Sequence, residues 1–345
     1  MGDQIFITAA IETDQKATVE AIKMLKKTSP NLVKVLGMSG TTENFLQFVV
    51  YSIDRNSVII NWKKVVLEQY PHEGINDNGS WASQSCVTDG EHMVASFGSY
   101  GFYCFDMGEN LIWGKDLGDM QVENAFGEGT SPIIYKDKLI IVWEHERQSK
   151  IYVLNKKSGE EIWQKDRDEV TTWAAPTVVE LDGKAQIIVP DRNKSRGYDI
   201  ETGDVIWELS GLGDGIIPCP IFDGEGVFLM TGFGKIKIVQ AINLKTAKGN
   251  LENSNTVIWT YDKNTSYVPY PLLKDGKIYY DALKPEGMAA AYASPVSANG
   301  NIYIIDRLGT SAVIKEGTEF KVISQNKLDD KFDASPAIVG NELLL

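Results

Sequence analysis

Cysteine, histidine and long apolar runs are all scarce in this sequence. Three cysteines (Cys86, Cys104 and Cys219) and three histidines occur in 345 residues, with no CxxC pair and no histidine at ligand spacing. We therefore predict small buried cysteines rather than metal ligands or a disulfide framework. The longest apolar runs, such as LIIVW at 139–143, are much shorter than the roughly 18–20 residues of a transmembrane helix. No transmembrane segment is expected.

Positive charge is scarce as well. The formal net charge is −13 at pH 7, and acidic residues are interleaved along nearly the whole chain. Nucleic-acid binding needs clustered Lys and Arg side chains that neutralise phosphates. We therefore expect no nucleic-acid partner.

The sequence does contain two short motifs that recur. The first is a turn followed by a β-rich run that ends in Trp, as in LNKKSGEEIW and YDIETGDVIW. It ends at Trp62, Trp113, Trp163, Trp207 and Trp259, at spacings of 51, 50, 44 and 52 residues. The second is a short apolar run, usually after Pro, that leads through Asp or Asn and Gly into another strand, as in APTVVELDGKAQIIV. Short strands with a period in the forties are typical of a β-propeller.

Each motif has a local physical reason. In KKSGEE and IETGDV the glycine supplies the positive φ that closes a short hairpin. Pro at the start of the apolar run removes no ladder hydrogen bond, because it stands at the first position of its strand. The terminal Trp offers a large flat surface, and we predict that it packs against the neighbouring blade rather than stacking on a ligand.

The alternation of SPxxxxDGxxY with xDxxTGxxxW resembles the pyrroloquinoline-quinone-like (PQQ-like) propeller repeat family, and the resemblance runs from about residue 4 to residue 345 outside an insertion. That family includes quinoprotein dehydrogenases and non-enzymatic envelope scaffolds such as the outer-membrane β-barrel assembly lipoprotein. Two segments, YPHEGINDNGSW at 70–81 and NKLDDKFDASPAIVGNELLL at the end, resemble a narrower subgroup of predicted secreted propellers.

We predict an all-β fold, a single β-propeller domain over residues 1–345 with four-stranded antiparallel blades. Eight blades are expected, one truncated and one incomplete. Residues 13–45 form an insertion in the first blade, with a surface helix predicted within 13–28. Residues 281–291 form a shortened connection, because Pro271 and Pro295 are only 24 residues apart. The sequence begins and ends within a blade, which favours a piece of a longer exported precursor and a periplasmic, cell-envelope or extracellular location. MGDQIFITAA lacks the features of a secretory signal, so a cytoplasmic location is the alternative.

A candidate ligand site follows from position in the propeller. The residues just before each innermost strand are expected at the mouth of the central channel, where aromatic rings could stack on a sugar, peptide or aromatic ligand. The aromatic candidates are Trp81, Phe126, Trp173, Tyr267, Tyr292 and Phe332, with Asp333 beside the last. The polar candidates are Asp191, Arg192, Arg196 and Arg307. The alternative is that these aromatic side chains are plugs between blades.

The segment WEHERQ at 143–148 is a second candidate. It is interpreted as a solvated hairpin loop, or alternatively as a cation or acid–base site. Carboxylates on both sides of His145 would raise its pKa.

Function is predicted to be non-enzymatic binding of a protein, peptide or polysaccharide by a monomeric scaffold. The resemblance implies, for quinoprotein members, a disulfide between adjacent cysteines, a calcium ion and a catalytic Asp. This sequence has no adjacent cysteines, and no Asp or Glu maps onto those positions, so we expect no catalytic residue, no metal, and no pyrroloquinoline quinone with Ca²⁺. The alternatives are a quinone-dependent oxidoreductase or another enzyme that uses the central funnel, such as a lyase or hydrolase, and a structural module of a multidomain protein.

Overall fold

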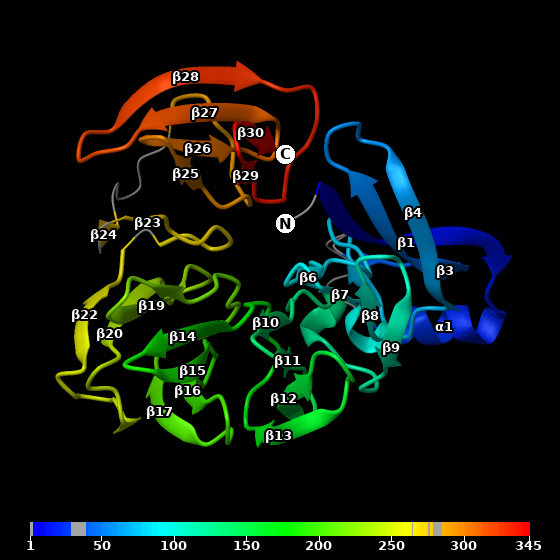
Figure 1. The fold of residues 1–345 in the computed structure, drawn as a ribbon, viewed down its shortest axis with the longest axis horizontal. Coiled ribbons are helices and arrows are strands. Elements are labelled where there is room, and N and C mark those ends of the chain that lie inside the picture. The colour runs from blue at the N-terminus through cyan, green and yellow to red at the C-terminus, as the bar shows by residue number, and fades with distance from the viewer. Residues whose placement is uncertain (1–2, 29–38, 264, 275–276, 279–284) are drawn as a thin grey trace. The chain divides into compact units, whose positions relative to one another are not determined.

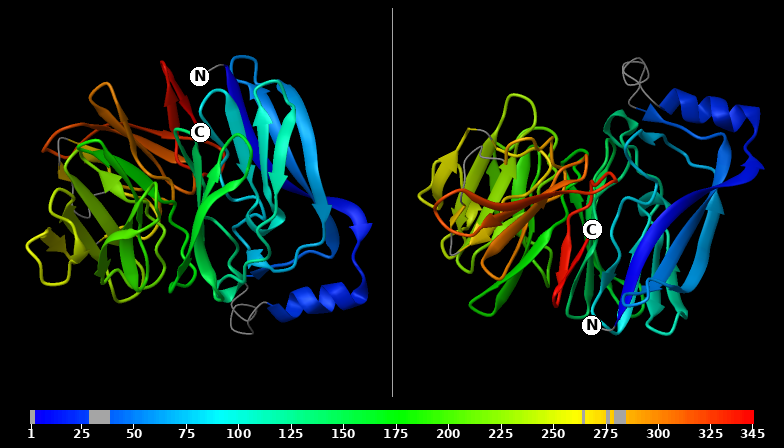
Figure 2. Two further views of the ribbon diagram at one scale, coloured as in Figure 1. Left: turned by 60° about the horizontal axis from the view of Figure 1, so that its bottom comes forward. Right: turned by 90° about the horizontal axis from the view of Figure 1, so that it is seen from above.

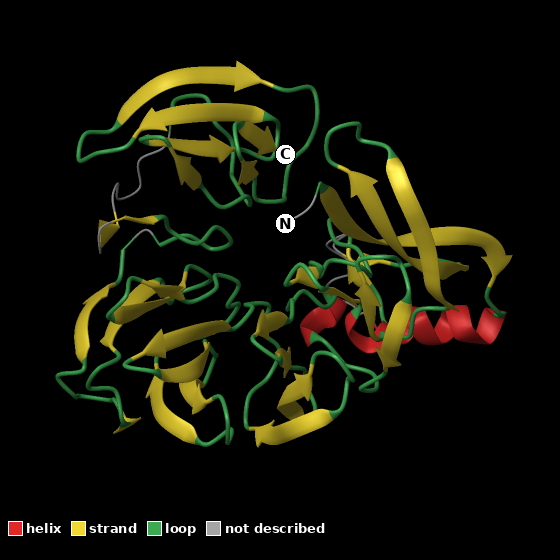
Figure 3. Cartoon of the chain, in the orientation of Figure 1, coloured by secondary structure: helices red, strands yellow, loops and turns green. Residues whose placement is uncertain are grey.

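The computed structural model describes residues 3–28, 39–263, 265–274, 277–278 and 285–345. Two compact units are distinguished, unit 1 (Met1–Pro176 with Glu201–Gly203) and unit 2 (Thr177–Ile200 with Asp204–Leu345). Antiparallel strands dominate both units (Figure 3). The single domain over residues 1–345 stays a prediction.

Unit 1 contains three successive sheets and a short ladder (Figure 1). The first sheet has the order β1-β3-β4, with β1 (Gln4–Lys16), β3 (Asn44–Asp54) and β4 (Ile60–Gln69). The second is formed by β6 (Val87–Thr88), β7 (His92–Ser96), β8 (Phe102–Asp106) and β9 (Leu111–Lys115). The third is formed by β10 (Ile133–Tyr135), β11 (Lys138–Trp143), β12 (Ser149–Asn155) and β13 (Glu161–Arg167). The short strands β2 (Ser39–Gly40) and β5 (Ile75–Asn76) pair with each other.

The predicted insertion lies between β1 and β3. Strand β1 continues to Lys16, and helix α1 (Val19–Thr28) begins where the Thr18 hydroxyl accepts the N–H of Ala21. The helix lies at one end of the first sheet (Figure 2) and buries Leu25, which is 1% exposed. The helix prediction is confirmed over the second half of 13–28, whereas residues 29–38 of the insertion lie outside the described residues. None of the helices that the structure describes is long and apolar enough to cross a membrane.

Unit 2 contains three further sheets. The first is formed by β14 (Thr177–Leu181), β15 (Lys184–Val189), β16 (Lys194–Asp199) and β17 (Val205–Ser210), and β21 (Gly249–Asn250) pairs with β17 in parallel. The second is formed by β18 (Ile221–Phe222), β19 (Gly226–Thr231), β20 (Ile238–Asn243) and β22 (Val257–Tyr261). The third is formed by β25 (Val296–Ala298), β26 (Asn301–Ile305), β27 (Thr310–Lys315) and β28 (Lys321–Lys327). Two ladders contain only two strands each, β23 (Leu273–Lys274) with β24 (Lys277–Ile278) and β29 (Ala337–Val339) with β30 (Glu342–Leu344).

The four-stranded antiparallel propeller blade is confirmed, but the number of eight blades is wrong. Six sheets of three or more strands form blades in the part of the chain that the structure describes. The physical reason is that the segments around β23–β24 and β29–β30 each supply one hairpin, without a described turn-to-Trp hairpin to complete a blade. The shortened connection at 281–291 lies partly outside the described residues.

A β-bulge recurs in the turn-to-Trp hairpins. In the third sheet Val153 pairs with Trp163 and Leu154 with Glu161, which leaves Ile162 as the extra residue. The same shift precedes Trp113 and Trp259. A bulge leaves its extra residue unpaired and bends the strand, and two of the extra residues are largely exposed. Ile162 is accordingly 42% exposed and Ile258 58% exposed.

Within unit 1 the tryptophans pack between blades, as predicted. Trp62 of β4 lies with its ring centroid 5.8 Å from that of Phe105 in β8. The Trp113 indole donates to the Lys156 carbonyl at 2.9 Å and covers Gly159, where a Cβ would stand 2.8 Å from the ring. Trp207 instead packs within its own sheet and donates to Gln186 at 2.8 Å. Cys104 is buried as expected, whereas Cys86 and Cys219 are only partly buried.

Candidate functional site

Five loops of unit 1 meet at one end of its sheets. Because the strands are antiparallel, the loops between consecutive blades lie at the same end as the loops between the second and third strands of each blade. These loops are residues 70–86, 97–101, 116–132, 144–148 and 168–176. We call this surface the loop face. Its loops are tied together by hydrogen bonds such as Val122 to Glu73 and Thr130 to the Thr172 carbonyl.

Two carboxylates form the centre of the loop face. Glu73, which is 6% exposed, accepts the Val122 N–H at 2.9 Å. Glu128 accepts the Ser99 N–H at 2.8 Å and also the Ser99 hydroxyl, whose oxygen accepts the Met120 N–H at 2.7 Å. Among the described residues, no Lys or Arg pairs with either carboxylate.

The backbone makes room for Glu128. Gly98 adopts a φ of 56°, and a Cβ at this position would clash with the Glu128 carboxylate. Such a φ is strained for residues other than glycine. Gly127 has a φ of 88°, and a Cβ there would stand 3.1 Å from Ile75. Glycine at 98 therefore lets the carboxylate approach the 97–101 loop closely enough to accept hydrogen bonds.

Two small pockets meet at Glu128. The first, which we call the acidic pocket, is lined by His72, Glu73, Gly74, Ile75, Trp81, Tyr100, Gly127 and Glu128. It has room for about one water molecule. The second pocket shares Gly127 and Glu128 with it and extends to Trp143, Glu144 and Trp173.

Burial governs the electrostatics of these groups. It raises the pKa of Glu73 to about 7, although the Val122 N–H acts in the opposite direction. It raises the pKa of Glu128 to about 8, although the hydrogen bonds from Ser99 favour the ionised form. The pKa of Tyr100 is raised well above its ordinary value, first by burial and then by the charge of Glu128. The acidic pocket can therefore exchange protons near neutral pH.

Three of the predicted aromatic residues lie at these pockets. Trp81 lines the acidic pocket and donates from its indole to the Glu73 carbonyl at 2.9 Å. Trp173 lines the second pocket and donates to the Gly127 carbonyl at 2.8 Å. The ring of Phe126 contacts that of Trp173, with 6.5 Å between the ring centroids. All three side chains are partly exposed, and their role in binding stays a prediction.

The remaining predicted residues lie in unit 2, where the structure brings three of them together. The Arg307 guanidinium donates to both oxygens of Asp333, at 2.6 and 3.0 Å, and lies 4.1 Å from the ring centroid of Tyr292. The other polar candidates are engaged elsewhere: Arg192 pairs with Asp214, Arg196 pairs with Glu208 and Asp191 is buried. The Tyr267 ring contacts Phe233, and Phe332 is partly exposed. The ligand-binding role of these residues is untested.

The WEHERQ segment is a loop that is solvated only in part: Glu146, Arg147 and Gln148 are exposed, whereas Trp143, Glu144 and His145 are buried. His145 is 6% exposed, and burial lowers its pKa despite the charge of Glu146. Its Nδ1 accepts the Gln121 N–H at 3.2 Å and its Nε2 lies 3.1 Å from the Gln148 carbonyl, which fits a neutral ring. Glu144 is buried and accepts hydrogen bonds from Arg167 at 2.8 Å and from Thr172. The predicted rise in the His145 pKa is therefore wrong, because desolvation outweighs the neighbouring charge.

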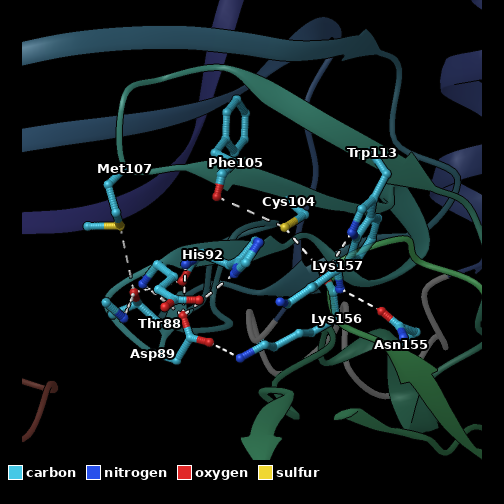
Figure 4. A network of polar contacts seen from close by, with 12 residues as sticks. Thr88, Asp89, His92, Cys104, Phe105, Met107, Trp113, Asn155, Lys156 and Lys157 are labelled. Carbon is cyan, nitrogen blue, oxygen red and sulfur yellow. Dashed lines mark hydrogen bonds and ion pairs between the residues drawn. The ribbon is translucent and has the colours of Figure 1, made fainter. Parts of the chain in front are cut away.

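A cluster of potential metal ligands lies in the β6–β7 hairpin. Asp89, Glu91 and His92 bring their ligand atoms within 4.8 Å of one another. Asp89, however, accepts the Glu91 and His92 amides at 3.0 and 2.8 Å and pairs with Lys156 (Figure 4). These bonds lower the pKa of Asp89 to about 2 against the opposing effect of burial. The cluster therefore joins two blades through an ion pair.

Sequence reasoning missed Glu73, Ser99 and Glu128. The YPHEG motif contains Glu73, but nothing in the motif predicts that its carboxylate is buried. Ser99 and Glu128 are 29 residues apart in the sequence and meet only in the folded chain.

Comparison with known proteins identifies the family. The sequence profile of the PQQ_2 family, described as outer membrane protein assembly factor BamB, matches residues 48–315. The chain belongs to this BamB family. The resemblance to PQQ-like propellers is thereby confirmed. No curated protein matches the chain significantly.

Several solved structures are similar to the BamB-family chain. BamB from Moraxella catarrhalis is 12% identical, with 98% of this chain and 96% of that chain covered and a TM-score of 0.47. A protein of unknown function from Bacteroides caccae is 13% identical, with 84% and 92% covered and a TM-score of 0.40. Quinohemoprotein alcohol dehydrogenase from Comamonas testosteroni is 16% identical, with 71% of this chain and 43% of that chain covered and a TM-score of 0.41.

Proposed function

We propose that this propeller is a non-enzymatic scaffold that binds a protein partner through the loop face of unit 1. The observation that carries the proposal is the pair of carboxyl groups, Glu73 and Glu128, which have no Lys or Arg partner in the described part of the chain and lie beside the partly exposed Trp81. Trp is enriched in binding hot spots, and acidic groups beside it can complement a basic group of a partner.

Two further observations support a scaffold. The loop face is held by buried hydrogen bonds, including those of Glu144 with Arg167 and Thr172, so its shape is organised before a partner binds. The family is also described as an assembly factor for outer membrane proteins, a role that depends on contact with other proteins. That description favours a periplasmic or cell-envelope location, and we expect the scaffold to be a monomer without a bound quinone.

Peptide and glycan arrays probed with the purified chain test this proposal. We expect peptides to be retained, and Trp81→Ala and Trp173→Ala to weaken their binding by about tenfold or more. The matched control is Trp259→Ala, which removes an indole that is 41% exposed on β22, and it should leave binding unchanged. Binding to glycans alone would favour a polysaccharide ligand, and an equal loss in all three variants would place the binding site elsewhere.

A further inference from the structure

The acidic pocket has an excess of hydrogen-bond acceptors. Among the described residues, its two carboxylates receive hydrogen bonds only from Val122 and Ser99. The Tyr100 side chain also lines the pocket, is only 5% exposed, and its hydroxyl has no hydrogen-bond partner in the described structure. Buried polar groups normally have partners, so this hydroxyl, which can accept as well as donate a hydrogen bond, has an unfilled place for a polar ligand.

His72 adds one more acceptor to the same pocket. Its Nε2 lies 2.9 Å from the Met120 carbonyl, which can only accept, so Nε2 carries the proton. In the neutral ring Nδ1 is then an acceptor; it is buried without a hydrogen bond within the described residues and lies 3.9 Å from a carboxylate oxygen of Asp119. Carboxylate oxygens, a phenol oxygen and an imidazole nitrogen thus surround one small space, and no Lys or Arg is among the described residues that line it.

The size and walls of the pocket select among cationic groups. The space holds about one water molecule, which suits a compact ammonium with three donors better than a planar guanidinium. The rings of Trp81 and Tyr100 form part of the wall, and aromatic rings attract ammonium groups and cover aliphatic stems.

We propose that the acidic pocket binds a primary ammonium group, and that the group is a lysine side chain of the protein partner. The identity of the partner as a protein rests on the proposed scaffold function, whereas binding of the ammonium group does not. An ammonium beside Glu73 and Glu128 favours their ionised forms, so both carboxyl groups would lose their protons and neutralise its charge, and the Tyr100 oxygen would accept one of its three N–H bonds.

Nuclear magnetic resonance titration with n-butylammonium tests the proposal on the full chain. The amides of Ser99 and Val122 donate directly to the two carboxylates, so their resonances report on the pocket. We expect both to shift and saturate in the wild-type protein, and the affinity to fall by about tenfold or more in Glu73→Gln and Glu128→Gln. Glu109→Gln, at an exposed hairpin position, should bind as the wild type does.

Parallel titrations distinguish the other ligands. An Arg analogue that binds as tightly as n-butylammonium, saturation by Ca²⁺ or Mg²⁺ alone, or no shift at either amide would each overturn the proposal. Shifts that persist unchanged in both Gln variants would also overturn it, because the amine would then bind elsewhere.

The proposal and the scaffold function can fail separately. If n-butylammonium binds but the peptide array stays empty, the pocket is an amine site and the scaffold function is wrong. If peptides bind equally well to wild type and Glu128→Gln, the scaffold stands and the lysine pocket is wrong.

Discussion

Environment decides what each acidic side chain does in this protein. Asp89 pairs with Lys156 and has a pKa lowered to about 2. Glu144 is also buried but is neutralised by Arg167. Glu73 and Glu128 have no such partner, and burial raises their pKa values to about 7 and about 8. Residue type alone could not separate these roles.

The raised pKa values predict a loss of stability as pH increases. A carboxyl group with an ordinary pKa of 4.5 in the unfolded chain and about 8 in the folded chain binds its proton more tightly when folded. Its contribution to the free energy of unfolding is therefore full below about pH 4.5 and decreases as pH rises toward about 8. Glu128→Gln should flatten this dependence and be more favourable relative to wild type at high pH than at low pH.

Urea unfolding of both proteins from about pH 5 to about pH 9 measures this difference. The other titratable groups around Glu128 are retained in both proteins; they are His72, Glu73, Tyr100, Asp119 and Glu146. Glu73, Tyr100 and Asp119 interact with the charge of Glu128, so the difference between the two profiles includes the change in their titration. Parallel pH profiles for wild type and Glu128→Gln would contradict the raised pKa of Glu128 in the folded chain.

Gly98 is predicted to be required for the position of Glu128. Gly98→Ala should lower the free energy of unfolding by about 1–3 kcal/mol, because it strains the backbone, and it should also displace the carboxylate. Gly90→Ala is the matched control, since Gly90 has a φ of 89° but no atom within 4 Å of a Cβ. If urea unfolding shows the same loss of stability in both variants, the clash with Glu128 does not contribute to the loss in Gly98→Ala.

At the scale of strands and hairpins, the Trp at the end of the fourth strand helps to join neighbouring blades in unit 1. Trp113 both donates to the Lys156 carbonyl and covers Gly159, and Lys156 also reaches back to Asp89 (Figure 4). The turn at residues 156–159, between β12 and β13, therefore contacts two hairpins of the second sheet, β6–β7 through Asp89 and β8–β9 through Trp113.

Trp113→Ala is expected to be more destabilising than the same change on an exposed strand. We predict a loss of about 3–4 kcal/mol, since an inter-blade ring and its hydrogen bond are both removed. Trp259→Ala, at a side chain that is 41% exposed, should cost about 1 kcal/mol. Chemical denaturation measures the free energy of unfolding of both variants. Equal losses would show that the contact of Trp113 between blades stabilises the protein no more than an exposed Trp does.

Much of the arrangement of strands and hairpins was predictable from the sequence. The Trp spacing predicted antiparallel blades, and the glycine turns predicted their hairpins. The bulge at Ile162 was not predictable, because a bulge leaves the local pattern of β-formers unchanged. The predicted number of blades was wrong for a related reason. The spacing of the repeated motifs shows where each hairpin lies in the sequence, but not whether further strands complete a four-stranded sheet around it.

The candidate site was predictable only in part. Aromatic positions before the innermost strands led to Trp81 and Trp173, which do line the two pockets. Glu73, Ser99 and Glu128 escaped prediction, since their contacts join loops that are far apart in the sequence. His145 was misjudged because its burial depends on the fold and not on its acidic neighbours.

For the molecule as a whole, the account predicts no quinone cofactor. Purified protein mixed with pyrroloquinoline quinone and Ca²⁺ should give the bare chain mass in native mass spectrometry and no quinone absorbance above that of the free compound. A stoichiometric quinone complex would contradict the scaffold function and favour an oxidoreductase.

The most direct test of the central claim is a peptide array in which every bound peptide is repeated with each Lys replaced by Arg. We predict that the wild type binds peptides through one Lys. Replacing that Lys, or introducing Glu73→Gln or Glu128→Gln into the protein, should lower binding by about tenfold or more. Peptide binding that is indifferent to both changes would contradict it.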